Sequence, residues 1–166
     1  RTIGATAFAY SISLGSIIFP ESLESIGDFA FANSALTGTI SIPKNLSYFG
    51  EGAFASCHNL VGFSVDESNV NYNSIDGVAY TEDGTTLVAY PAGNTNYSYS
   101  ILNNTKKIGG AAFYGAKYVT KVQFNRELEE IDDYAFSNAT SLYAPTMPIG
   151  LMKIGRMAFE YTDNLY

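Results

Sequence analysis

Apolar and polar positions along the chain repeat with a 23-residue period, far longer than the period of a helix or a strand. Six segments share an apolar first residue, a Gly next to it in all but one, and an Ala-Phe pair four and five positions on. These segments begin at Ile3, Ile26, Phe49, Ile108, Ile131 and Ile154. One such unit is too small to bury its apolar side chains alone, so the period predicts units stacked in a solenoid.

Within each unit, apolar residues first alternate with polar ones and then give way to the Ala-Phe segment. Alternation with a period of two predicts a short strand. The alternating pairs are Ile17/Phe19, Ile40/Ile42, Phe63/Val65, Tyr99/Ile101 and Val122/Phe124. Pro20, Pro43 and Pro148 follow at one column and end the strand. We expect parallel strands on one face of the solenoid and short helical or 3₁₀ turns carrying Ala-Phe on the other.

Two columns of the repeat have a specific structural interpretation. A large ring beside a small residue in every unit predicts an aromatic ladder, in which each Phe lies on the Phe of the next turn. The ladder would consist of Phe8, Phe31, Phe54, Phe113, Phe136 and Phe159. The Gly column, where Asp132 is the exception, indicates tight or left-handed backbone.

The interval from Phe49 to Ile108 is more than twice as long as the others and predicts an insertion at about 66–100. Its segment 76–93, "DGVAYTEDGTTLVAYPAG", contains two strand-like runs around "TEDG", in which Asp83-Gly84 can supply the positive φ of a hairpin turn. We expect a β-hairpin there. The polar segment 66–74 is expected to be a loop that leads into it.

The adjacent Cys57 and His58 could form a nucleophile and base, or half of a metal site. Cys57, however, occupies a column of small residues three positions after each Phe. A buried thiol there behaves as a small hydrophobe, and the chain has no second Cys or His to complete a zinc site. We therefore expect Cys57 to be structural, with no catalytic residues, metal or cofactor.

Charge narrows the classes of partner. The net charge is −7 and the pI about 4.5, which argues against nucleic acid and anionic membranes, because both require clustered Lys and Arg. The sequence contains no run of about 18 apolar residues, so we expect no membrane span. The acidic run 127–133 could hold calcium or a catalytic carboxylate pair, but we expect it to be a solvated edge.

The repeat resembles the BspA-like leucine-rich-repeat family. "IPKNLSYFGEGAFASC", Ile42–Cys57, follows that family's repeat closely, and interruptions like "DGVAYTEDGTTLVAYP" are found in the family. The departures are Asp132 at the Gly column, Asn125 at the Pro column, and a Cys column filled only by Cys57. The resemblance implies a right-handed leucine-rich-repeat solenoid, secreted or surface-exposed, associated with adhesion and without catalytic residues.

Residues 1–166 are expected to form a single repeat domain. Neither end shows an atypical capping repeat, so we expect a fragment of a longer array with a tendency to associate end to end.

Alternation also predicts which strand residues point outward, and we call these residues the strand face. The face is small, polar and almost uncharged, so it either binds a partner or serves only solubility. Its residues are Ser16, Ile18, Thr39, Ser41, Ser64, Ser100, Lys121, Gln123 and Thr146.

We expect this surface to bind another protein of a host or neighbouring cell. The alternative is a carbohydrate-binding module that uses some of the 13 tyrosines. Whether the glycosylation sequons carry glycans stays open; they are at Asn45, Asn96, Asn103 and Asn138.

Overall fold

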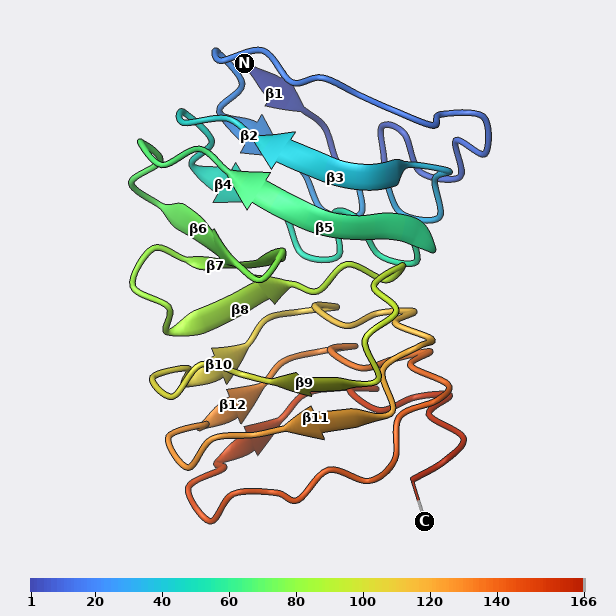
Figure 1. Ribbon diagram of the computed structural model, residues 1–166, viewed down its shortest axis with the longest axis vertical. Coiled ribbons are helices and arrows are strands. Elements are labelled where there is room, and N and C mark those ends of the chain that lie inside the picture. Colours follow the sequence, from blue (N-terminus) through green and yellow to red (C-terminus); the bar gives the residue numbers. More distant parts are fainter. Residues whose placement is uncertain (166) are drawn as a thin grey trace.

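The chain folds as a β-solenoid of about seven turns in a computed structural model that describes residues 1–165. Figure 1 shows the turns stacked along the long axis, with the N-terminus at one end and the C-terminus at the other. Two ladders of parallel strands run along the stack. The predicted leucine-rich-repeat solenoid with parallel strands is thus confirmed.

The first ladder consists of two-residue strands that end on the apolar residue opening each Gly-x-x-Ala-Phe motif. Strands one repeat apart pair in parallel, so that Ile26, for example, lies opposite Phe49. The strands are β1 (Thr2–Ile3), β2 (Ser25–Ile26), β4 (Tyr48–Phe49), β10 (Lys107–Ile108), β12 (Glu130–Ile131) and β13 (Lys153–Ile154).

The second ladder contains the predicted alternating strands. It is divided into two parallel pairs, β3 with β5 and β9 with β11. In β3, Ile40 and Ile42 are buried while Thr39 and Ser41 are exposed, as alternation requires. The segments 17–19 and 144–148 form no strand. The four strands are β3 (Thr37–Ile42), β5 (Asn59–Val65), β9 (Ser98–Ser100) and β11 (Lys121–Gln123).

The Ala-Phe segments consist of turns, and the expected helical detail is not confirmed because residues 1–165 contain no helix. Backbone N–H groups bond alternately within the turn and to the next turn. The N–H of Ala30 donates to Gly27 (3.2 Å), and the N–H of Phe31 donates to Ala53 (2.7 Å). Two residues per segment are left-handed, such as Phe29 (φ 53°) and Asn33 (φ 58°).

The Gly column has a different cause from the predicted one. None of its five glycines has a positive φ. Instead, neighbouring turns approach so closely that a Cβ on Gly50 would lie 2.4 Å from the carbonyl carbon of Gly27. The column therefore marks close backbone contact between turns.

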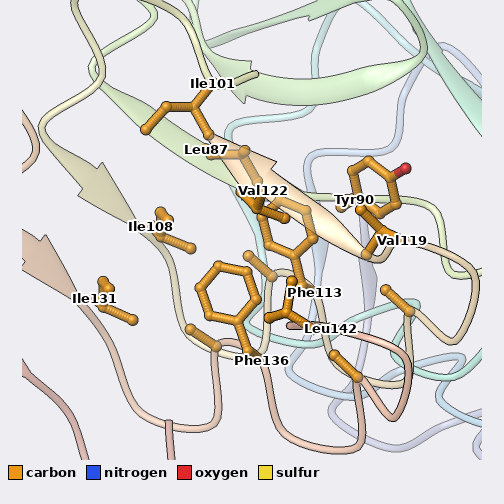
Figure 2. Close-up of a cluster of buried hydrophobic side chains, with 14 of the residues drawn as sticks. Leu87, Tyr90, Ile101, Ile108, Phe113, Val119, Val122, Ile131, Phe136 and Leu142 are labelled. Carbon is orange, nitrogen blue, oxygen red and sulfur yellow. The ribbon is translucent and has the colours of Figure 1, made fainter. Parts of the chain in front are cut away.

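The aromatic ladder runs along the core and gains one member. The rings of Phe8, Phe31 and Phe54 stack with centroids 5.2 and 5.1 Å apart. In the other half, Tyr90 stacks on Phe113 (4.6 Å), and the ladder continues from Phe113 through Phe136 (4.7 Å) to Phe159 (5.1 Å). Figure 2 shows the Phe113 and Phe136 rings among the buried aliphatic side chains.

The insertion forms two hairpins instead of one. The predicted hairpin is β7 (Val78–Thr81) with β8 (Thr86–Ala89), and Gly84 in its turn has a φ of 71°. A second hairpin pairs β7 with β6 (Tyr72–Ile75) through Asp76-Gly77, whose φ values of 52° and 78° fit a two-residue hairpin turn. The expectation of a loop throughout 66–74 is therefore wrong from Tyr72 onward.

Strand β8 returns the chain to the solenoid and opens a turn that the repeat pattern missed. It pairs in parallel with β10, with Leu87 opposite Ile108. Only three positions separate Leu87 from the ladder ring of Tyr90, whereas five separate Ile108 from Phe113. The flanking turns close over this short segment, since the N–H of Ser56 donates to the carbonyl of Tyr114 (3.0 Å).

Strand β7 divides the hydrophobic core into two clusters. Val78 and Tyr80 are fully buried in the C-terminal cluster, whereas Ala79, between them in sequence, is fully buried in the N-terminal cluster. Alternation along one strand thus directs side chains into two different cores. The inserted strand is an internal wall and not a surface projection.

Candidate binding surface

All nine strand-face residues are exposed, but the fold places them in separate groups. Thr39, Ser41 and Ser64 lie on the β3–β5 pair, with Ser41 opposite Ser64. Ser100, Lys121 and Gln123 lie on the β9–β11 pair, with Ser100 opposite Gln123. Ser16, Ile18 and Thr146 lie outside any strand. Figure 1 shows the insertion between the two strand pairs.

The N-terminal group borders a small hollow of about 200 Å³. Ser41 and Ser64 line it together with Glu21 and Asp66. A hollow of this size lies below the usual range for small-molecule pockets. We therefore regard the C-terminal group as the stronger candidate.

The C-terminal group lines a larger groove, which we call the β11 groove. It has a volume of about 570 Å³ and lies between residues 120–126 on one side and 143–146 with Pro148 on the other. Lys121, Gln123 and Thr146 are on its walls. A second hollow of about 630 Å³ shares residues 123–126 with it and reaches Ser100. Four predicted strand-face residues thus line two hollows that share residues 123–126.

The β11 groove exists because β11 is paired along one edge only. Toward β9, Lys121 donates its N–H to Tyr97 (3.0 Å) and Gln123 accepts from Ile101 (3.2 Å). Alternate residues of a parallel strand bond to opposite sides, so the N–H and C=O of Val122 face the groove. Within residues 1–165, no backbone hydrogen bond links β11 to 144–148; the single bond nearby runs from Tyr143 N–H to Thr120 (2.9 Å).

Two prolines account for the course of the opposite wall. Pro145 and Pro148 hold their own φ at about −65° and restrict the residues before them to extended conformations. Because a proline has no N–H, Pro145 and Pro148 cannot donate to β11, and the segment runs beside it without a backbone hydrogen bond. Its side chains, including Tyr143 (60% exposed), make the groove largely apolar.

The charge in the β11 groove is positive, against the negative net charge of the chain. Lys121 has no ion-pair partner within residues 1–165, and Arg126 lies 3.3 Å from Glu127 on the exposed rim. The groove thus presents unpaired backbone groups, an apolar wall and one free ammonium group. These are the groups that hold an extended polypeptide carrying an acidic side chain.

The Cys57 thiol lies in the interior. It is fully buried, 3.3 Å from the Ser34 hydroxyl and 3.1 Å from the carbonyl oxygen of Phe31. Burial raises the thiol pKa, which disfavours the thiolate needed of a nucleophile. His58 is exposed on the following loop. No cluster of three metal-ligating side chains occurs in residues 1–165.

The acidic run differs from the expected solvated edge at one residue. Asp132 is only 8% exposed and lies between Lys107 (2.6 Å) and Lys153 (2.9 Å), which flank it on adjacent strands. Burial acts to raise the pKa of Asp132, but the two lysines outweigh it and lower the pKa below its ordinary value. This carboxylate is held by ion pairs and offers no free ligand position.

Comparison with known proteins agrees with this architecture. The model of the BspA type leucine-rich repeat region matches residues 1–96 and 89–166, with six copies. No curated protein sequence matches the chain significantly. In the part of the chain that the structure describes, no helix is long and apolar enough to cross a membrane.

Three solved structures are similar over nearly the whole chain. The pneumococcal vaccine antigen PcpA is 33% identical with a TM-score of 0.91 over 98% of this chain. A leucine-rich cell surface protein from Faecalibacterium prausnitzii is 25% identical (TM-score 0.76, 99%), and a leucine-rich repeat protein from Eubacterium ventriosum is 24% identical (TM-score 0.85, 97%). The chain spans 40%, 49% and 49% of these proteins, less than half of each.

Proposed function

Because the chain belongs to the BspA-type leucine-rich-repeat family, we propose that it is a non-catalytic protein-binding module of a secreted or cell-surface protein. The names of two similar proteins, a vaccine antigen and a cell surface protein, support this placement. So does the architecture, since stacked repeats present long surfaces suited to protein partners.

The observation that carries the proposal is the unpaired edge of β11 inside a groove of about 570 Å³. An extended segment of a partner would lie along β11 and bond to the backbone groups of Val122, while its side chains contact Tyr143 and Pro145. Lys121 would pair with an acidic residue of that segment. Backbone bonds would supply affinity, and the side-chain contacts would supply specificity.

The test compares two double variants against a panel of purified extracellular-matrix proteins. Lys121→Glu with Gln123→Arg changes the β11 groove, and Ser41→Arg with Ser64→Arg changes the equivalent strand pair of the N-terminal half. All four residues are exposed, so both variants should fold, which circular dichroism can verify. We expect at least about tenfold weaker binding for the groove variant only, the effect of losing about 1.4 kcal/mol. Loss of binding in the serine variant alone would place the site on β3–β5.

A further inference from the structure

A second groove crosses the Ala-Phe turns, away from the strand pairs. We call it the turn groove; its volume is about 360 Å³. Asn33, Ser56 and Asn138 line it from three different turns, and all three are left-handed with φ values of 58°, 54° and 58°. They therefore occupy the same position of the repeat, so their side chains recur along the stack.

The short Tyr90 segment makes this groove continuous. Because that segment is two residues shorter than its neighbours, the turn at Ser56 contacts the turn at Tyr114 directly. The contact is close, since a Cβ on Gly115 would lie 2.2 Å from the Ser56 hydroxyl. A row of polar side chains that the insertion would otherwise interrupt is joined into one groove.

The polar side chains of the turn groove have spare hydrogen-bonding capacity. Within residues 1–165, the side chains of Asn33, Ser56 and Thr140 make no hydrogen bond to the protein, and Asn138 bonds only to the neighbouring Ser137 (3.1 Å). The backbone at these positions is occupied instead: Asn33 N–H donates to Ala55 (2.8 Å), and Asn138 N–H donates to Glu160 (2.8 Å). The groove thus offers amides and hydroxyls but no free strand edge for a peptide.

The charge of the groove and the ring of Tyr114, one of the aromatic side chains that line it, add two further requirements on a ligand. Lys117 has no ion-pair partner within residues 1–165, and no Asp or Glu lines the groove, although the chain has 16 acidic and nine basic residues. The ring of Tyr114 is half-buried and held edge-on against Phe29 (6.5 Å, 84°). A ligand that fits has many hydroxyl groups, an apolar C–H face for the ring and one anionic group for Lys117.

We propose that the turn groove binds an acidic saccharide, with its carboxylate or sulfate on Lys117 and its hydroxyls on Asn33, Ser56 and Asn138. This site is separate from the β11 groove. The absence of a free strand edge favours a sugar over a peptide here, the reverse of the situation at β11. Asn33 and Asn138 would act as paired donors and acceptors for neighbouring hydroxyls.

The test measures binding of 3′-sialyllactose, lactose 3′-sulfate and lactose by calorimetry, with amide NMR shifts to locate the site. We expect both acidic sugars, or one of them, to bind at least tenfold more tightly than lactose and to shift the amides of Asn33, Ser56 and Asn138. The two acidic sugars distinguish a carboxylate from a sulfate.

Two variants and one control complete the design. Lys117→Ala should weaken the acidic sugars at least tenfold and leave lactose unchanged. Asn138→Gly, which keeps the left-handed backbone, should weaken all three sugars. Lys44→Ala removes an exposed lysine that lines neither the turn groove nor the β11 groove, and should leave the affinity for all three sugars unchanged. Three results would overturn the proposal: equal affinity for lactose and the acidic sugars, no acidic-sugar binding at millimolar concentration, or an unaffected Lys117→Ala variant.

Protein binding at β11 should survive Lys117→Ala, so the two proposals fail independently.

Discussion

The two halves of the solenoid share one backbone plan but fill their cores with different chemistry. In the N-terminal half, Phe8, Phe31 and Phe54 stack, and the rings of Phe49 and Phe63 pack edge-on against Phe54 (5.7 and 5.4 Å). In the C-terminal half the ladder begins with Tyr90, and Tyr80 and Tyr99 lie in or against the same core. Strand β7 is the wall between the two.

The C-terminal core differs from the N-terminal one because it holds the phenol groups of Tyr80, Tyr90 and Tyr99 in a low-dielectric interior. The hydroxyls of Tyr80 and Tyr99 bond to each other at 2.6 Å, while the buried hydroxyl of Tyr90 has no partner within residues 1–165. Burial raises the pKa of Tyr90 to about 12, and burial with the Tyr80 hydrogen bond raises the pKa of Tyr99 further. The same scaffold thus accepts a core built mainly of Phe rings or one that contains buried phenol groups, and the second core is the more sensitive to alkaline pH.

Removing one central ring from each half should have the largest effect. Phe31→Ala and Phe136→Ala each delete a fully buried ring stacked on both sides, so we expect each to lower the free energy of unfolding by about 3–5 kcal/mol. Urea denaturation measures this. Phe8→Ala is the control, since Phe8 is 39% exposed and should lose much less. A loss below about 1 kcal/mol for the buried rings would contradict the ladder.

Substitutions on the shared wall should act on one core each. Ala79→Leu overfills the N-terminal cluster, and Val78→Ala leaves a gap in the C-terminal one; we expect each to cost about 1–3 kcal/mol. Hydrogen exchange should show lost protection around Phe31 for Ala79→Leu and around Phe113 for Val78→Ala. Identical exchange changes in both variants would mean that β7 does not separate the cores.

Alkaline pH should weaken the C-terminal half more than the N-terminal half, where the exposed Tyr48 also has a raised pKa because its hydroxyl donates a hydrogen bond to Asp28. A phenol whose pKa is raised on folding contributes stability below its unfolded pKa of about 10, and that stability is lost as pH rises through its folded pKa. For Tyr90 the loss at pH 11 is about 1.4 kcal/mol, which Tyr90→Phe should abolish. Urea melts at pH 8 and 11 measure it. The background should be Cys57→Ala, because burial also raises the pKa of that thiol in the N-terminal half. Equal losses in both halves would refute this distinction.

Cys57→Ala should have the smallest effect. The thiol fills a small column and makes two weak sulfur contacts, so we expect a loss of about 1 kcal/mol or less and unchanged binding. Native protein should react slowly with a thiol reagent, and unfolded protein rapidly. Rapid labelling of the folded chain would show that Cys57 is accessible.

Structural features that recur in every turn could be predicted from the sequence, whereas features found in a single turn could not. Alternation located the strands of the second ladder, and the repeat period located the aromatic stack, because those contacts recur in register. The two-residue strands of the first ladder were not predicted. The position of Tyr90 in the ladder was not predicted, because its turn is two residues shorter than the others and the residue is a Tyr instead of a Phe. Asp76-Gly77 was a recognisable hairpin signal between "YNSI" and "VAY" that the assignment of a loop passed over.

The candidate site was predictable in part. Alternation identified Lys121 and Gln123 as outward-facing residues of a strand. It could not predict the groove beside them, because a repeat pattern fixes register but not whether each backbone bond forms. The burial of Asp132 has a signal in the sequence: Lys107, Glu130 and Lys153 recur one repeat apart, so their side chains stack beside it.

The position of β7 between the two cores also sets the order in which they can form during synthesis. A chain leaves the ribosome N-terminus first. The N-terminal core lacks one side until Ala79 has emerged, so its turns remain open while the preceding segment is made. Once β7 and the following strand β8 are in place, Val88 and Ala89 complete that core, and β7 presents Val78 and Tyr80 to the C-terminal one. The later turns can then add one by one onto a template that already exists.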